Sequence, residues 1–176
     1  MRPTAIVYAS ATGFTARYAA LLSRQTGLPA YGLREPEGPP SGSRVLFLGW
    51  LRAGCIQGLR RARKRYRVAA VCFVGMMEGD PAGVAKVVSS NRLEHTPHFY
   101  LRGGYAPERL RGLARVMMAP IAFFLTRKPP QTEADRAVQE AFAHGADWTD
   151  PARLEPVLAW LADACPPAGG PMDTGR

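Results

Sequence analysis

The chain has 176 residues, a formal net charge of +9 and three cysteines. This length suits one domain, which we place at residues 1–165, and the Pro- and Gly-rich stretch 166–176 is expected to be disordered. The cysteines are odd in number and form no C-x-x-C pair, so neither a disulfide framework nor a cysteine metal site is expected. Too few residues precede the first apolar run for a signal peptide, which favours a cytoplasmic protein.

Apolar runs and segments of helical spacing alternate along the chain. Strands are predicted over residues 4–9, 29–33, 44–49, 68–75 and 97–102, and helices over residues 14–26, 56–66, 81–91, 107–126, 132–144 and 151–164. This alternation predicts an α/β fold, with a parallel sheet and helices on both of its faces. The runs at 44–49 and 68–74 are almost continuously apolar and are expected at the sheet centre. The proline-rich stretch 34–43 predicts an irregular crossover instead of a helix.

A polar turn at residues 10–13 separates the first predicted strand from the first predicted helix. The amides at a helix start lack partners and carry a partial positive charge, so this turn is suited to bind a phosphate. Ser10, Thr12 and Thr15 supply hydroxyl groups, and Gly13 lets the backbone approach an anion closely. The same residues would also serve as an ordinary helix cap. The glycine spacing matches neither the P-loop nor the dinucleotide fingerprint, which disfavours nucleoside triphosphates and dinucleotides.

Three segments of the chain resemble the flavin loops of the flavodoxin family. Residues 10–15, Ser-Ala-Thr-Gly-Phe-Thr, match the family's FMN phosphate loop, S/T-x-T-G-x-T. Residues 49–54, Gly-Trp-Leu-Arg-Ala-Gly, resemble its second loop, and residues 75–79, Gly-Met-Met-Glu-Gly, its third. The chain is similar to the divergent flavodoxin domain-containing branch that includes the bacterial flavodoxin-like protoporphyrinogen oxidase. The resemblance implies a flavodoxin-like, doubly wound, five-stranded parallel sheet of order 2-1-3-4-5 with bound FMN.

The resemblance places the flavin at the carboxyl edge of the sheet, where the three loops emerge. Trp50 and Leu51 would cover one face of the ring, and Met76 and Met77 would supply the other wall. The small residues of the second loop would let a peptide approach and flip beside the ring. Arg52 would raise the potential for full reduction, unless it faces solvent. The expected cofactor-binding residues are Ser10, Ala11, Thr12, Gly13, Phe14, Thr15, Gly49, Trp50, Leu51, Arg52, Ala53, Gly54, Gly75, Met76 and Met77.

Two basic segments suggest contacts with other molecules. The cluster at residues 60–67 is either a solvated helix face or a positive surface for an acidic redox partner protein, an anionic membrane or a carboxylated small molecule. No aromatic platform accompanies it, so nucleic acid is not expected. Residues 109–128 predict an apolar helix with basic ends. It would lie in a membrane interface, cover a quinone or tetrapyrrole site, pack in the core, or form a homodimer.

The sequence therefore predicts a cytoplasmic, FMN-binding electron-transfer protein of flavodoxin type, without catalytic or metal-ligating residues of its own. One alternative is a flavin-dependent oxidoreductase that acts at the membrane on a quinone or, like a protoporphyrinogen oxidase, on a tetrapyrrole. Another alternative is a scaffold that has kept the fold and lost the flavin. Turnover with a small molecule as sole acceptor would identify the enzyme, and the absorbance of the purified protein would identify the scaffold.

Overall fold

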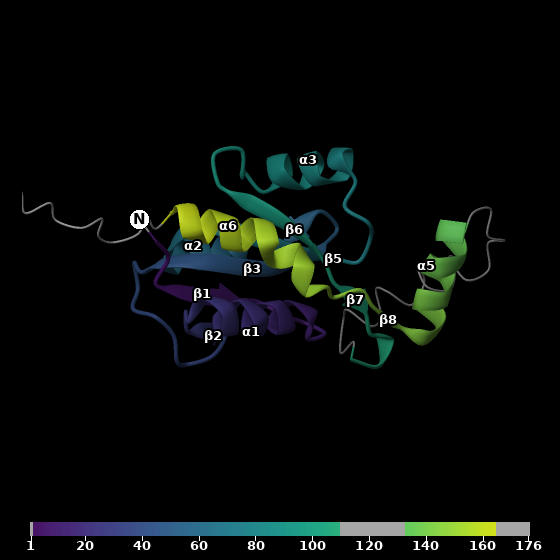
Figure 1. Ribbon diagram of the computed structural model, residues 1–176, viewed down its shortest axis with the longest axis horizontal. Helices are drawn as coiled ribbons and strands as arrows, with labels where there is room; N and C mark the ends of the chain where they lie inside the picture. Colours follow the sequence, from purple (N-terminus) through teal and green to yellow (C-terminus); the bar gives the residue numbers. More distant parts are fainter. Residues whose placement is uncertain (1, 110–132, 165–176) are drawn as a thin grey trace, which may run out of the picture.

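The structure, a computed structural model, describes residues 2–109 and 133–164 as an α/β fold (Figure 1). Its strands are β1 (Ala5–Tyr8), β2 (Ala30–Gly32), β3 (Arg44–Arg52), β4 (Cys55–Ile56), β5 (Arg67–Gly75), β6 (His98–Arg102), β7 (Gly104–Tyr105) and β8 (Ala146–Asp147). Its α-helices are α1 (Phe14–Thr26), α2 (Leu59–Arg65), α3 (Pro81–Ser90), α5 (Glu133–His144) and α6 (Glu155–Asp163). Two short 3₁₀ helices are η1 (Pro107–Arg109) and η2 (Pro151–Leu154).

The central sheet has six strands, and five of them run parallel in the order β2-β1-β3-β5-β6. The sixth strand, β4, pairs antiparallel with the end of β3. The α/β class, the mostly parallel sheet and the order of the five parallel strands agree with the prediction. The predicted count of five strands was wrong because it missed β4. The two most apolar strands, β3 and β5, lie side by side at the centre, where residues 45–49 and 69–74 are buried.

Alternate residues of each strand enter two separate cores, because successive side chains of a strand point to opposite faces. One core packs the sheet against α1 and α6, and it includes Ile6, Leu46, Cys72, Tyr18 and Val157. The other core packs the opposite face against α2 and α3, and it includes Val7, Phe47, Phe73, Leu59 and the partly buried Val87. Helices therefore cover both faces, as predicted.

The amino-terminal end of β5 contains a β-bulge. Val45 pairs with Val68, whereas Leu46 pairs with Ala70, so Ala69 has no partner residue in β3. An extra residue bends its strand and disrupts the ladder locally. The bulge lies at the amino edge of the sheet, at the opposite end of β5 from Gly75, where the chain leaves the sheet for the third predicted flavin loop.

Residues 104–147 make an excursion between β6 and α6. Its two ends pair as the antiparallel ribbon β7–β8, and the amide of Trp148 donates a 2.9 Å hydrogen bond to the carbonyl of Gly103. Figure 1 shows the ribbon and α5 beyond the carboxyl ends of the sheet strands, at the end of the molecule away from the N-terminus. The predicted helix at 132–144 is confirmed as α5. The helix predicted at 107–126 lies outside the described residues except for η1.

Two predicted boundaries change for identifiable reasons. The helix expected to start at residue 56 starts at Leu59, because residues 55–56 form β4 and Gly58 occupies the cap position with φ of 87°. The crossover at residues 34–43, which the structure describes throughout, contains no helix, as its prolines predicted.

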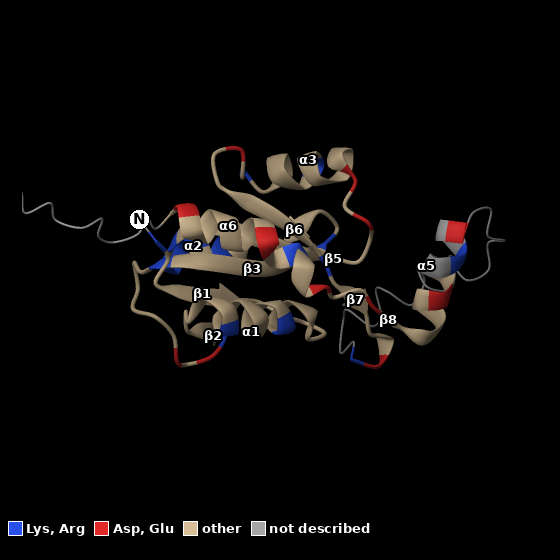
Figure 2. Ribbon diagram, viewed as in Figure 1, with Lys and Arg blue, Asp and Glu red and all other residues tan. Residues whose placement is uncertain are grey.

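The basic cluster falls mostly on α2, which carries Lys or Arg at every position except Leu59 and Ala62. These two residues are buried, at 2% and 0% exposure, and most of the basic side chains point away from the core. Figure 2 shows these basic residues in blue on α2, close to the marker of the N-terminus. The cluster is therefore an exposed helix face. Its exposure is compatible with both sequence interpretations, a solvated face and a surface that binds a partner.

Candidate functional site

The polar turn between β1 and α1 lies at the carboxyl edge of the sheet. The hydroxyl oxygen of Ser10 accepts a 3.1 Å hydrogen bond from the amide of Gly13 and closes the turn. Ser10 and Ala11 are exposed, and Thr12 is partly exposed. Thr15 is buried, at 1% exposure. The turn thus presents the first two of its three predicted hydroxyl groups at the surface, while the third sits within the first turn of α1.

No side chain caps α1. The cap position is occupied by Gly13, with φ of 101°, which has no side chain that could accept from the first amides of the helix. That conformation favours glycine, since a Cβ would crowd the backbone. The amides of Phe14, Thr15 and Ala16 begin the helix, and such amides find no acceptor within a helix. The only side-chain bond of the turn to this region is therefore that of Ser10 to the Gly13 amide, and no described side chain accepts from the amides of residues 14–16, which remain suited to an anion.

Arg109 of η1 lies close to this turn, although the two are far apart in sequence. Its Nη1 lies 3.4 Å from the carbonyl oxygen of Thr12, 97 residues away, and a Cβ on Gly13 would lie 3.2 Å from the same nitrogen. The side chain of Arg109 is 65% exposed and pairs with the adjacent Glu108 at 3.5 Å. An exposed guanidinium group thus lies beside the helix start. Sequence reasoning did not assign Arg109 to the turn, because no local pattern connects the two.

The second predicted flavin loop is a strand and a tight hairpin, whereas the sequence interpretation ended the strand at residue 49. β3 continues to Arg52, which pairs with Cys55 of β4. The two turn residues between them, Ala53 and Gly54, have φ of 48° and 75°. Positive φ at both central residues is the geometry of a two-residue type I′ hairpin. Ala53 and Gly54 are exposed at its tip, and Leu51 is partly buried.

Gly49 is small because the hairpin folds back over it. A Cβ at this position would lie 2.6 Å from Cγ2 of Ile56 and 2.8 Å from the carbonyl oxygen of Gln57. Packing within the hairpin therefore explains this glycine. The neighbouring Trp50 is partly buried, and Arg52 is exposed with its guanidinium carbon 5.8 Å from the centroid of the Trp50 ring.

Asn91, at the C-terminal end of α3, clamps the hairpin turn. Its Nδ2 donates a 2.8 Å hydrogen bond to the carbonyl of Gly54, and its Oδ1 accepts a 3.0 Å bond from the amide of Ile56. Arg63 of α2 in turn donates to the carbonyl of Asn91 at 2.8 Å. The bond to Gly54 opposes the peptide flip that the small residues of this segment suggested. Asn91 is distant in sequence, and no local pattern marked it.

The third predicted flavin loop follows β5 and is held by Tyr100 of β6. The Tyr100 hydroxyl donates to the carbonyl of Met77, and a Cβ on Gly75 or Gly79 would collide with the Tyr100 side chain. Burial raises the pKa of Tyr100 to about 12, so the hydroxyl remains a donor at neutral pH. Met77 is 55% exposed, and Met76 is partly buried. The loop therefore offers an apolar side chain on a fixed backbone.

Ion pairs connect this loop to the chain on both sides of the excursion. Glu78 lies 2.6 Å from a guanidinium nitrogen of Arg102 and 3.2 Å from one of Arg153. The guanidinium carbon of Arg102 lies 4.4 Å from the centroid of the Trp148 ring, within cation–π range. Trp148 is thus engaged by Arg102 at the carboxyl end of β6. This contact fixes where the returning chain crosses the sheet edge.

A cavity of about 470 Å³ opens between the first turn of α1 and the excursion. Gly13 and Arg17 line it from α1, Arg109 from η1, His144 from α5 and Asp147 from β8. Arg17 and Asp147 form an ion pair across it. The cavity therefore adjoins the predicted phosphate turn, and its two arginines are balanced by two carboxylates, since Arg109 also pairs with Glu108.

The charge state of Asp147 follows from its surroundings. Burial acts to raise the pKa of this carboxyl group, but hydrogen bonds from Thr149 and the positive charge of Arg17 outweigh it and hold the pKa below its ordinary value. Asp147 is therefore ionised at neutral pH and keeps Arg17 partly neutralised. Arg109 has only its neighbour Glu108 for this purpose among the described residues.

Two segments for which the sequence made predictions lie largely or wholly outside the described residues. Of the segment 109–128, only Arg109 is described, and the tail 166–176 lies outside the described residues. Among the helices described, none is long and apolar enough to cross a membrane. Within residues 2–109 and 133–164, no group of three or more His, Cys, Asp or Glu side chains is placed to hold a metal ion.

No family model, curated protein or solved structure matches this chain. Its function is therefore inferred from the fold and from the side chains gathered at the carboxyl edge of the sheet.

Proposed function

We propose that this chain is a flavodoxin-like protein that binds one FMN at the carboxyl edge of its sheet and transfers electrons. The turn at residues 10–13 and the start of α1 would hold the phosphate. The ring would lie between the hairpin at residues 50–54 and the loop at residues 75–79. The bound flavin would supply the redox chemistry, and the chain's own residues would set its position, its access to water and the charge around it.

The observation that carries this proposal is the uncapped start of α1 at Gly13. A monophosphate needs a compact group of donors, and the amides of residues 14–16 with the hydroxyls of Ser10 and Thr12 supply one. Arg109 adds a cation that can reach the same point, since its Nη1 already lies 3.4 Å from the Thr12 carbonyl. The site is short and lacks a second glycine-lined stretch, which favours FMN over a dinucleotide such as FAD.

The two segments expected around the ring have matching character. Trp50 is an aromatic side chain at partial burial, and Met77 is an exposed apolar side chain whose backbone Tyr100 fixes. Such residues suit the two faces of a flat aromatic ring. Residues 10–15 and 49–54 contain no acidic residue, Glu78 of the third loop is paired with Arg102 and Arg153, and Arg52 is exposed next to Trp50. Arg52 would therefore stabilise negative charge that develops on the ring, and its substitution by alanine should lower the potential for full reduction.

The exposed basic face of α2 supports an acidic protein as redox partner. Most of its basic side chains are exposed around the buried Leu59 and Ala62, although Arg63 also donates to the carbonyls of Asn91 and Arg92. A dense positive surface speeds the approach of an acidic partner and makes the association depend on ionic strength. Electron transfer to such a partner should slow as salt is added.

A titration with three ligands tests FMN binding. The protein without flavin should bind FMN more tightly than riboflavin, which lacks the phosphate, and more tightly than FAD. Gly13→Val should weaken FMN binding and leave riboflavin binding unchanged, because only the phosphate contact is disturbed. Arg109→Met should weaken FMN binding about tenfold, as the loss of one charge-assisted hydrogen bond predicts.

Gly42→Val is the matched control, because Gly42 also has a left-handed φ, of 84°, but has open space around it. This variant should cost stability and leave the preference for FMN over riboflavin intact. A protein that binds no flavin, or a Gly13→Val variant that weakens FMN and riboflavin equally, would show that the turn is only structural.

A second candidate function is a flavin-dependent oxidoreductase that acts on an anionic small molecule, such as a tetrapyrrole with its carboxylates, or on a quinone at a membrane. The observation that favours it is the 470 Å³ cavity beside the turn, whose wall holds the ion pairs of Arg17 with Asp147 and of Arg109 with Glu108. Steady turnover of the flavin-loaded protein with a small molecule as sole acceptor would establish the enzyme. Dependence on a partner protein would establish the carrier.

A further inference from the structure

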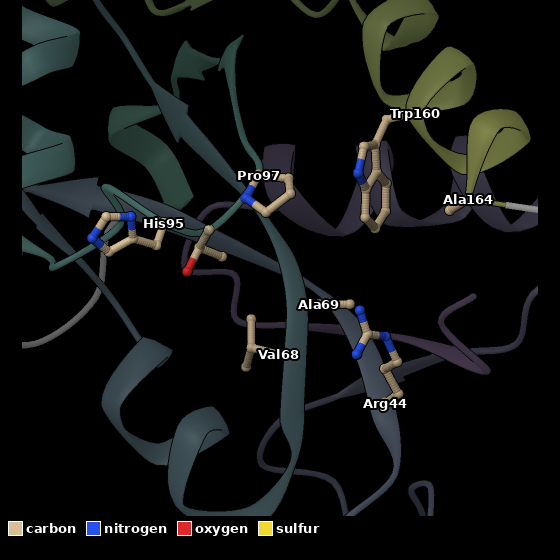
Figure 3. A pocket seen from close by; sticks show the side chains of 8 residues that line it. Arg44, Val68, Ala69, His95, Pro97, Trp160 and Ala164 are labelled. Atoms are coloured by element: carbon tan, nitrogen blue, oxygen red, sulfur yellow. The ribbon is translucent and has the colours of Figure 1, made fainter. Parts of the chain in front are cut away.

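A second cavity, of about 340 Å³, lies at the amino edge of the sheet, opposite the proposed flavin edge (Figure 3). Arg44 begins β3, and Arg52 ends it eight residues later, so roughly 25 Å of extended strand separates the two edges. The bulge in β5 helps to form this cavity. Ala69, which has no partner in β3, and Val68 line it from below, while Pro97 and Trp160 line it from above (Figure 3).

Arg44 brings to this cavity a guanidinium group that has no ion-pair partner among the described residues. Its Nε is buried and has no hydrogen-bond partner, and its guanidinium pairs with no acidic side chain in the described part of the chain. Figure 3 shows the guanidinium beside Ala69, on the side of the cavity that faces the ring of Trp160. None of the residues that line the cavity is acidic. An anion that entered the cavity would therefore meet a guanidinium group that no described carboxylate neutralises.

Trp160 supplies a flat apolar wall in a fixed orientation. Its ring centroid lies 6.2 Å from that of Phe99, which packs it against the sheet on one side. Pro97 adds a second rigid apolar surface, and His95 also lines the cavity (Figure 3). A volume of this size sits at the lower end of the range for small-molecule sites. The cavity therefore combines a planar cation with an aromatic platform.

We propose that this cavity binds a small planar aromatic carboxylate. The carboxylate would accept hydrogen bonds from the two terminal nitrogens of Arg44, a bidentate arrangement that the flat guanidinium favours. The ring would lie against Trp160 and Pro97. This site is separate from the proposed flavin site and does not depend on it. It gives the chain a place where a metabolite or effector binds without touching the carboxyl edge.

The test follows the three tryptophans of the full-length protein by NMR. Trp160→Phe assigns the Trp160 indole signal, and benzoate is then added to the unsubstituted protein. The Trp160 signal should shift and saturate, while the signals of Trp50 and Trp148 stay in place. Acetate, which lacks the ring, and benzyl alcohol, which lacks the charge, should each bind at least about tenfold more weakly than benzoate.

Two substitutions separate a specific contact from general charge attraction. Arg44→Met keeps the length of the side chain and removes the guanidinium, so benzoate binding should fall about tenfold or more. Arg67→Met is the matched control, because Arg67 starts β5 opposite Arg44, is exposed and does not line the cavity. Its effect on benzoate binding should be less than about twofold, as expected for a screened surface charge.

Three results would overturn the proposal. One is the absence of a saturable shift of the Trp160 signal with benzoate. Another is an equal loss of binding in Arg44→Met and Arg67→Met, which would reduce the effect to net charge. The third is acetate binding as strong as benzoate binding, which would leave the aromatic wall without a role. Addition of FMN should leave the Trp160 signal unchanged, so this test and the flavin titration can fail independently.

Discussion

The hydroxyl group of Tyr18 donates a 2.6 Å hydrogen bond to the carbonyl oxygen of Arg102 and so ties the middle of α1 to the end of β6. The same oxygen accepts a 3.1 Å bond from the amide of Asp150, just before η2. Tyr18 is fully buried, and this burial raises the pKa of its hydroxyl, which therefore stays protonated. One polar atom thus joins three segments that meet beside the excursion.

Tyr18→Phe should lower the free energy of unfolding by about 1–3 kcal/mol, because it leaves a carbonyl and an amide without their partner. Urea unfolding measures the loss. Tyr31→Phe serves as the control, since the hydroxyl of Tyr31 makes no hydrogen bond to the described residues, and its effect should stay within about 0.5 kcal/mol. Equal losses in the two variants would show that the hydrogen bonds of Tyr18 contribute nothing specific.

Asn91→Ala should release the hairpin of β3 and β4. The variant loses the bonds to Gly54 and Ile56, so the amide of Ile56 should exchange with solvent faster, by the equivalent of about 1–3 kcal/mol. Hydrogen exchange followed by NMR measures this change. The amide of Val71, bonded to Pro97 at 2.9 Å, is an internal control and should keep its protection. Unchanged exchange at Ile56 would mean that strand pairing alone holds the hairpin.

Ala53→Asn should stabilise the protein by about 0.5–1 kcal/mol. Ala53 has φ of 48°, a conformation that asparagine tolerates better than alanine and that two-residue hairpins favour. Thermal melting measures the gain. Ala20→Asn gives the opposite sign, because Ala20 is exposed within α1 and asparagine is the weaker helix former there by about 0.5 kcal/mol. A loss of stability in both variants would contradict the hairpin geometry.

The stability contributed by Asp147 should depend on pH. Its folded-state pKa is lowered, so the contribution is present above the unfolded-state pKa and is lost as the pH falls through the folded-state value. The difference in melting temperature between the native protein and Asp147→Asn should therefore be largest near neutral pH and shrink below about pH 4. High salt should reduce it, since the side chains of Arg17 and Asp147 are 58% and 45% exposed.

The control for this prediction is the same comparison in an Arg17→Met background. Without the cation, the pH-dependent part of the difference should become smaller, while the part due to Thr149 remains. If Arg17→Met leaves the pH profile of the difference unchanged, the ion pair does not contribute to the lowered pKa.

The sheet was predictable because its strands are strongly patterned. The runs that became β3 and β5 are apolar at nearly every position, as strands covered on both faces must be. The strand β4 was missed for a local reason. Its turn is Ala53–Gly54, without the asparagine or aspartate that usually marks a two-residue hairpin, so residues 50–54 were interpreted as a loop. The strands β7 and β8, which pair with each other, have two residues each and are too short to show any periodicity.

The candidate site was predictable where it is local in sequence and not where it depends on distant contacts. The turn at residues 10–13 could be recognised, because strand, turn and helix follow one another directly. Arg109 reaches Thr12 across 97 residues, and Asn91 reaches Gly54 across 37. Such contacts depend on how the elements pack, and a single sequence carries no local sign of them.

The ribbon of β7 and β8 has a consequence for how this chain can change over evolution. Gly104 pairs with Asp147, so the two ends of the excursion are held side by side, whatever the length of chain between them. Closing a longer loop costs little more than closing a shorter one, since the cost grows only with the logarithm of length. We therefore expect that insertions or deletions in the chain between these two ends leave β6 and α6 in place. This variable segment lies at the edge of the sheet where the proposed ligand would bind. Changes in it could alter ligand specificity while both cores stay as they are.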